Sequence, residues 1–176
     1  MTNASGDFDY RGVWQAIEAE RIARGLSRTA AVKDIHWLEA RVINNLEHGI
    51  GTTCQHITGL LRWLGRSPES FMPGIKDRPE YAIPDVGPFA VRWSMPALYD
   101  AVDARRAELG MSWQQVGDEL NWPTVKALKN SKYGIPMDLA MRVTRWLGQP
   151  AATFMYAAEP APPGVKSATW GTAETT

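Results

Sequence analysis

The sequence predicts an all-α protein made of two similar five-helix units in tandem, joined by a proline-rich linker. Three observations predict it. Apolar residues recur at helical spacing through most of the chain, Gly110–Asn130 carries start and stop signals for two short helices around a tight turn, and the first half contains a copy of the second. Each unit has only ~60 residues, which is marginal for independent folding, so we expect the units to pack together.

The internal repeat is visible at both ends of each unit. Trp14–Ser27 aligns with Tyr99–Ser112 with the apolar anchors in register. The tetrapeptide Arg-Trp-Leu-Gly at residues 62–65 recurs at residues 145–148, and each copy is followed at the same gap by Phe-Met. Repetition at a fixed spacing indicates a duplication and decides how the rest of the chain is interpreted.

The predicted helices follow from apolar stripes and capping residues. In the first unit we expect helices near residues 10–24, 28–35 and 38–47, then one that begins at a cap on Thr52 or Thr53 and a brief fifth helix that buries Phe71. In the second unit they fall near 96–109, 113–120, 124–131, 136–147 and 150–155. Trp63 and Trp146 follow the apolar stripes of their helices and are interpreted as packing residues.

Gly110–Asn130 has the most specific local signals. Ser112 and Gln115 form a Ser-x-x-Gln capping box, in which each side chain satisfies a backbone N–H at the start of a helix. Gly117 has no side chain, which would let a second helix cross closely behind it. Pro123 can only begin a helix. Together these signals outline a helix-turn-helix.

The linker and the end of the chain have different compositions. Four prolines between residues 73 and 94 prevent a helix and predict an extended segment. Within it Phe89, Val91 and Trp93 alternate with other residues, which fits either one short strand or an apolar strap laid across both units, and we favour the strap. From Ala157 onward a flexible tail is predicted. The predicted boundaries are 10–72, 73–94, 95–156 and 157–176.

Composition limits the class of protein. The chain of 176 residues is 44% apolar and 22% charged, as in soluble globular proteins, and no apolar run is long enough to cross a membrane. The polar start is unlike a secretory signal, and the single cysteine, Cys54, excludes an internal disulfide and suits a cytoplasmic protein. Because the net charge is zero, any binding of nucleic acid must come from local placement of charge.

Catalytic and metal-binding patterns are weak. His48, Cys54 and His56 are too few for a zinc site and straddle a predicted helix start, and Cys54 has no orienting partner as a nucleophile. The sequence shows no glycine-rich phosphate loop, paired catalytic carboxylates or hydrolase elbow. We therefore expect no enzyme activity, no metal and no cofactor.

A known family shares this arrangement. The order of five short helices, with Glu-Leu-Gly-Met-Ser at residues 108–112 and Trp-Leu-Gly followed by Pro and Phe near the end of each unit, resembles the DNA-binding domain of lambda repressor and the Cro and XRE-type regulators. The resemblance implies a transcriptional regulator that binds double-stranded DNA, with a recognition helix in the major groove and a preceding scanning helix on the backbone. Such proteins usually dimerise, so we expect either a homodimer or, because one chain holds two copies, an intrachain pseudo-dimer.

The length of the second unit departs from the repeat. Gly25 and Gly110 are 85 positions apart, whereas Trp63 and Trp146 are 83 apart, so the second unit has lost two residues. The loss falls most simply in its turn, at residues 121–123.

The start of the scanning helix departs from the family as well. The family often has a Gln that binds phosphate there; Arg28 can serve in the first unit, whereas Trp113 is a poor substitute and Gln114 is its stand-in. The first unit also places Val32 where the family has a small residue, unless a shift of one brings Ala31 there.

Candidate DNA contacts in the second unit are cationic. Lys126, Lys129 and Lys132 recur every third residue, so they can share one side of the recognition helix and meet a row of phosphates. Thr124 and Asn130 could add hydrogen bonds. On spacing alone these residues would be a solvated helix face, but the helix-turn-helix context favours DNA.

Candidate contacts in the first unit are Glu39, Arg41, Asn44 and Asn45. Arg reads guanine and Asn reads adenine in the major groove, whereas Glu39 would repel phosphate unless it faces cytosine. An ordinary polar surface explains this set equally well. Two alternatives to a DNA-binding regulator remain: a protein-interaction scaffold, which the zero net charge and Trp113 favour, and a chain in which only one copy binds DNA.

Overall fold

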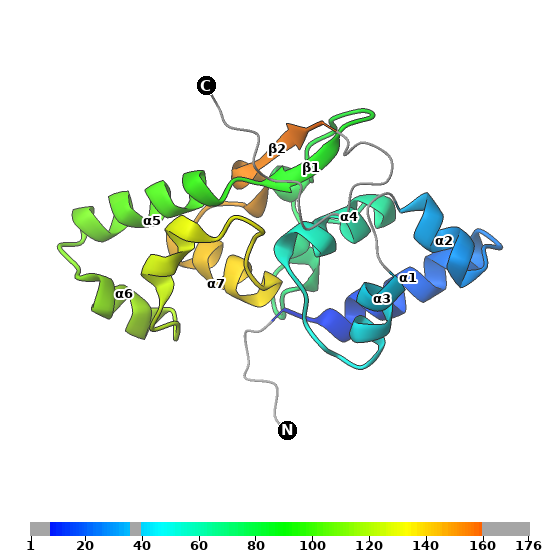
Figure 1. The fold of residues 1–176 in the computed structure, drawn as a ribbon, viewed down its shortest axis with the longest axis horizontal. Helices are drawn as coiled ribbons and strands as arrows, with labels where there is room; N and C mark the ends of the chain where they lie inside the picture. The colour runs from blue at the N-terminus through cyan, green and yellow to red at the C-terminus, as the bar shows by residue number, and fades with distance from the viewer. Residues whose placement is uncertain (1–7, 36–39, 160–176) are drawn as a thin grey trace.

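The computed structural model describes residues 8–35 and 40–159 and is mostly helical, with one two-stranded sheet (Figure 1). The first half holds α1 (Tyr10–Ala23), α2 (Arg28–Asp34), α3 (Ala40–Glu47), α4 (Cys54–Leu64) and the short 3-10 helix η1 (Pro68–Phe71). The second half holds α5 (Met95–Glu108), α6 (Trp113–Glu119), η3 (Val125–Asn130), α7 (Met137–Leu147) and η4 (Ala151–Phe154), and η2 (Pro79–Tyr81) lies between the halves. The all-α class predicted from the sequence is confirmed.

Local capping residues set the helix bounds. Thr53, one of the two predicted candidates, caps α4 with its side chain, and Ser112 with Gln115 forms the predicted capping box at the start of α6. Gly65 and Gly148 end α4 and α7 with φ of 65° and 67°, a backbone conformation that glycine adopts at little cost.

The linker and the last described residues pair with each other. β1 (Ala90–Trp93) runs antiparallel to β2 (Met155–Ala158), so the favoured strap interpretation is wrong for these four linker residues. Residues 157–158, assigned to a flexible tail, belong to β2. The Gln55 side chain on α4 accepts a hydrogen bond from Trp93 N at 2.9 Å and donates to Trp93 O at 3.1 Å. The sheet therefore ties the end of the second half to the first.

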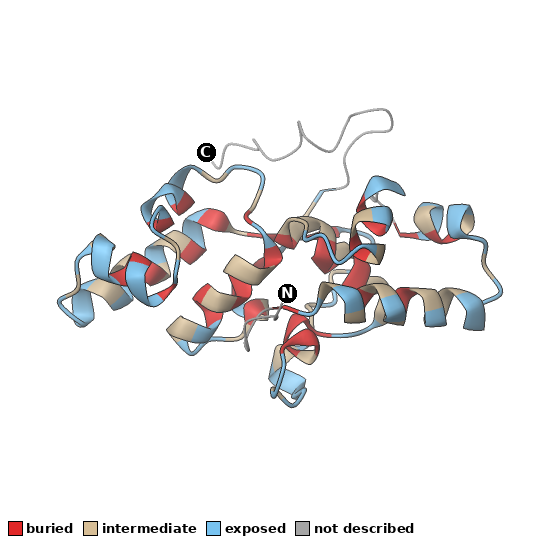
Figure 2. Ribbon diagram, turned by 90° about the horizontal axis from the view of Figure 1, so that it is seen from below, coloured by how far each residue is buried: buried red, intermediate tan, exposed pale blue. Residues whose placement is uncertain are grey.

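One hydrophobic core runs through both halves. Buried apolar residues of α1, α3 and α4 form a single cluster with those of α5, α6 and α7. α4 and α7 contact each other in the middle of the molecule, and buried residues concentrate on the inward sides of the helices (Figure 2). The two halves therefore pack on each other.

Equivalent polar contacts occur in both halves. Trp63 Nε1 on α4 donates to Asp34 at the end of α2 at 2.7 Å, and Trp146 Nε1 on α7 donates to Glu119 at the end of α6 at 2.6 Å. Each indole thus ties the fourth helix of its half to the second. Both tryptophans pack half buried against the core, as their predicted packing role requires.

The halves meet across an approximate two-fold axis. Cys54 N donates to Ile135 O at 2.8 Å, and Met137 N donates to Thr52 O at 3.0 Å. The repeat relates residues that are 83 positions apart, which pairs Thr52 with Ile135 and Cys54 with Met137. Each of the two hydrogen bonds is therefore the repeat-related equivalent of the other. In Figure 1 a half-turn about the viewing direction exchanges α1 with α5, α2 with α6 and α4 with α7.

Candidate nucleic-acid interface

The turn after α6 is fixed by its backbone. Asn121 has a φ of 48°, and among the described residues it is the only non-glycine with positive φ. Its N–H donates to Asp118 O, while Trp122 N donates to Gly117 O at 2.8 Å, which closes the C-terminal end of the helix. A Cβ on Gly117 would lie 3.0 Å from the Trp122 carbonyl oxygen. A side chain at this position would therefore crowd the backbone of the turn, which passes behind Gly117 in place of the crossing helix expected from the sequence.

The segment predicted to be the recognition helix of the second half contains a 3-10 helix, η3, where an α-helix was predicted. η3 buries Val125 and Leu128. A 3-10 helix has about three residues per turn, so side chains three apart eclipse each other. Lys126 and Lys129 therefore share one edge of η3, and both are exposed.

The corresponding elements of the two halves, α3 and η3, differ in length. α3 has 8 residues and η3 has 6. The segments that follow, 48–53 and 131–136, are equal in length. The shortened turn stays a prediction, because residues 36–39 of the corresponding turn lie outside the described residues.

The lysine row is open to solvent. Lys126, Lys129 and Lys132 are all exposed, as is Asn130 at the end of η3. Lys132 lies beyond η3, so only Lys126 and Lys129 share its edge. The Lys129 ammonium lies 5.8 Å from the centroid of the Tyr99 ring, close enough for a cation–π contact that orients it. The row presents local positive charge on a chain whose net charge is zero.

Trp113 occupies the first position of α6, where the family often binds phosphate. Its ring stacks on Tyr99 with centroids 5.3 Å apart and 15° between the planes, and the Arg106 guanidinium lies 5.2 Å from its centroid. Trp113 is half buried. It packs α6 against α5 at the position where Arg28 stands in the first unit.

Two other side chains predicted to contact DNA, those of Gln114 and Thr124, form hydrogen bonds with nearby residues of the same segment. Gln114 is exposed, but its Nε2 donates to Asp118 Oδ1 at 3.0 Å. Thr124 Oγ1 accepts from Trp122 Nε1 at 3.0 Å. A phosphate would have to replace the Gln114 contact, whereas the Thr124 hydroxyl can still donate its own proton.

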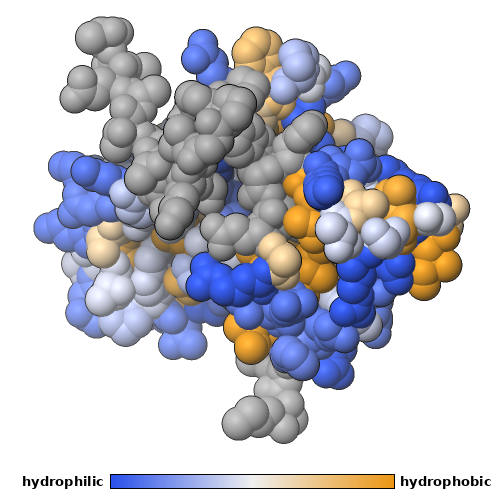
Figure 3. All heavy atoms as spheres, turned by 45° about the vertical axis from the view of Figure 1, so that its right-hand side comes forward, coloured by the Kyte–Doolittle hydropathy of each residue, from blue (hydrophilic) through white to orange (hydrophobic). Residues whose placement is uncertain are grey.

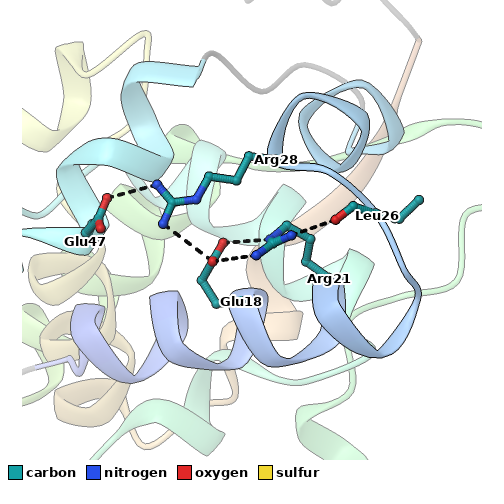
Figure 4. Close-up of polar contacts among 5 residues, drawn as sticks. All are labelled: Glu18, Arg21, Leu26, Arg28 and Glu47. Atoms are coloured by element: carbon teal, nitrogen blue, oxygen red, sulfur yellow. Dashed lines mark hydrogen bonds and ion pairs between the residues drawn. The ribbon is translucent and has the colours of Figure 1, made fainter.

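Arg28 lies between two carboxylates (Figure 4). Its Nη2 is 3.5 Å from Glu18 Oε2 and its Nη1 is 3.3 Å from Glu47 Oε2. Glu18 also accepts hydrogen bonds from Arg21, which are the main reason that its pKa is lowered, and Arg21 donates to Leu26 O at 2.7 Å. DNA phosphate would have to compete with Glu18 and Glu47 for Arg28.

α3 turns its predicted base-reading residues outward. Arg41 and Asn44 are exposed and Asn45 is half buried, while Glu39 lies outside the described residues. The side of α3 that faces the core consists of Val42, Ile43 and Leu46. The structure thus places the two predicted sets on two separate elements, α3 and η3, one in each half.

Sequence reasoning missed Arg142. Its Nη1 on α7 donates to Leu120 O at 2.8 Å and to Asn121 O at 3.2 Å, which satisfies carbonyls at the end of α6 and in the turn. No local pattern marks Arg142, because its partners lie 22 and 21 positions earlier in the chain. The positive φ of Asn121 could have been predicted from its residue type, because Asn adopts a left-handed conformation more readily than most residues.

The surface of the first half is mixed in character. Figure 3 shows the side on which the first half comes forward, where hydrophilic side chains predominate with apolar groups between them. Residues 8–35 and 40–159 contain no group of His, Cys, Asp and Glu able to hold a metal, and no helix among them could span a membrane. Cys54 is buried, and burial raises the pKa of its thiol to about 12, which disfavours the reactive thiolate.

The segment from α6 to η3 therefore combines a capped helix, a left-handed turn at Asn121 and exposed lysines. Comparison of the chain with protein families, curated proteins and solved structures gives no match. What the chain does must be inferred from its own residues and their placement.

Proposed function

We propose that this chain is a sequence-specific double-stranded DNA-binding transcriptional regulator of the Cro/repressor type, built from two tandem helix-turn-helix units. The α6–turn–η3 arrangement carries the proposal, because it sets a short second helix on a capped first helix and leaves Lys126 and Lys129 exposed on one edge. Ammonium groups in such a row suit a line of phosphates. α3 adds the exposed Arg41 and Asn44, whose side-chain types read guanine and adenine.

The approximate two-fold supports an intrachain pseudo-dimer over a homodimer. Helix-turn-helix dimers read two half-sites one DNA turn apart. Here both recognition elements belong to one chain, and the exchanged hydrogen bonds of Cys54 and Met137 hold the halves together. We expect sedimentation of the complex to show one chain per duplex; a stable two-chain species would contradict the pseudo-dimer.

Charge reversal on η3 tests the proposed surface. Lys126→Glu together with Lys129→Glu should weaken DNA binding more than about tenfold at low salt, since attraction for phosphate becomes repulsion. If only the three lysines meet phosphates, log K should fall with log salt with a slope of about −3, from about 0.9 per contact. Fluorescence anisotropy on a duplex selected from random DNA measures both. Lys76→Glu, an exposed lysine in the linker, is the matched control. Unchanged affinity of the double variant would exclude this surface.

A protein-interaction scaffold that keeps the fold without reading DNA is the second candidate. Three observations favour it: the carboxylates around Arg28, the packed position of Trp113 and the zero net charge. Retention on heparin and on mixed-sequence DNA separates the two functions. A regulator should elute later as salt is lowered, whereas a scaffold should show no steep dependence on salt.

A further inference from the structure

The junction places α3 and η3 on the same side of the molecule. The contacts between Cys54 and Ile135 and between Met137 and Thr52 are related by the approximate two-fold. A half-turn leaves every element at the same height along its axis, and the axis lies along the viewing direction of Figure 1. The two recognition elements therefore face one way with opposite polarity. Inverted half-sites on a duplex have the same relation, so one such surface can meet two neighbouring half-sites.

The two elements differ in chemistry. α3 exposes Arg41 and Asn44, whose planar groups can make two hydrogen bonds at once to the edge of a single base. η3 exposes Lys126 and Lys129, which are point charges on long stems and attract phosphate without distinguishing one base pair from another. η3 is also two residues shorter, with 6 residues against 8 in α3. The pseudo-symmetric scaffold thus carries one element suited to reading sequence and one suited to gripping the backbone.

We propose that one chain binds one inverted DNA site with unequal halves, in which α3 reads the base sequence of one half and η3 holds the phosphates of the other with little base readout. This inference rests on the proposed function. It identifies the target as an asymmetric site, unlike the palindrome that two identical subunits would select.

Selection of bound duplexes from random DNA tests the asymmetry. For the wild-type chain we expect sequence preference in one half-site only, while a hydroxyl-radical footprint protects two stretches about 10 base pairs apart. Asn44→Ala should lower discrimination at one base pair by roughly tenfold and leave the salt slope unchanged. Lys126→Ala with Lys129→Ala should weaken all duplexes equally and reduce the salt slope by about 1.8, from about 0.9 per contact.

Gln149→Ala is the control, because Gln149 is an exposed amide outside α3 and η3 and should not alter the selected sequence. Circular dichroism and thermal unfolding establish that each variant is folded. A consensus with two equally specified halves, two chains on one site, or a lysine variant with a different preferred sequence would overturn the asymmetry and leave the proposed function standing. Failure of the wild-type chain to bind any selected duplex would overturn both.

Discussion

The hydroxyl of Tyr10 in α1 lies 2.7 Å from Oδ1 of Asp138 in α7 and accepts a hydrogen bond from Asp138 N at 3.0 Å. α7 begins after Pro136, which makes no side-chain cap. Tyr10 therefore supplies, from the other half of the molecule, the oxygen that a capping residue would normally provide.

η4 depends on the first half in the same way. Glu69 Oε1 accepts from Ala151 N at 2.7 Å, at the first residue of η4, and the preceding Pro150 makes no side-chain cap. At the equivalent positions of the first half, Thr53 and Ser67 cap their own helices. The starts of α7 and η4 are thus completed across the junction.

Tyr10→Phe should lower the free energy of unfolding by about 1–2 kcal/mol, since it removes a hydrogen bond to a carboxylate and leaves Asp138 N without its acceptor. Urea denaturation measures the change. Tyr133→Phe is the control, because Tyr133 is 58% exposed, and it should change stability little. Equal stability of Tyr10→Phe and wild type would show that the cap contributes nothing.

As pH rises, the free energy of unfolding of the Glu69→Gln variant should increase relative to that of the wild-type chain. Burial raises the pKa of Glu69 above its ordinary 4.5, so the folded state holds the proton more tightly than the unfolded state. Stability from the protonated carboxyl is therefore complete below pH 4.5 and is lost as pH rises through the folded pKa. The glutamine keeps an acceptor for Ala151 N and has no such loss. Thermal melts between about pH 4 and pH 8 measure the difference. For the exposed control Glu80→Gln, the difference in melting temperature between variant and wild type should not change with pH. A difference that does not change with pH for Glu69→Gln would refute the prediction.

Gly117→Ala and Gly59→Ala form a matched pair in two helices. A Cβ at Gly117 would lie 3.0 Å from the Trp122 carbonyl oxygen, whereas nothing lies within 4 Å of one at Gly59. We expect a loss of more than about 1 kcal/mol at Gly117 from overpacking and a gain of about 0.5–1 kcal/mol at Gly59 from helix propensity. Chemical denaturation measures both. A stabilised Gly117→Ala would mean that the turn does not approach α6 closely.

Glu47→Gln should strengthen DNA binding if the proposed function is correct. The change removes one of the two carboxylates that pair with Arg28, so Arg28 becomes more available to phosphate. We expect roughly a twofold to tenfold gain in affinity at low salt. Glu108→Gln at the exposed end of α5 is the control. Weaker binding by Glu47→Gln would argue against phosphate contact by Arg28.

Helix bounds were predictable because their signals are local. Ser112 and Gln115 act within one turn of the helix they start, and Gly65 acts at the residue after the helix it ends. The sheet was not predictable, because Trp93 pairs with Met155 far along the chain and four residues of alternation also fit a strap. The 3-10 conformation of η3 was not predictable either, because buried residues three apart, such as Val125 and Leu128, fit both an α-helix and a 3-10 helix.

In the candidate site, too, local features were predictable from the sequence and contacts between distant residues were not. The spacing of Lys126 and Lys129 predicted a shared exposed edge, and both are exposed on η3. The pairing of Arg28 with Glu18 and Glu47 joins three helices, so no pattern within one helix could reveal it. Contacts between residues on the same helix were predictable from the sequence. Contacts between residues far apart in the chain depend on how the helices pack, so only the structure shows them.

The capping of α7 and η4 by Tyr10 and Glu69 makes the second half depend on the first for its stability. A fragment that starts after the linker would leave the backbone N–H groups of Asp138 and Ala151 without the oxygens of Tyr10 and Glu69 that accept from them. The two copies are therefore expected to be inherited together, and a truncated gene product that retains only the later copy should be cleared by proteases as an unstable chain.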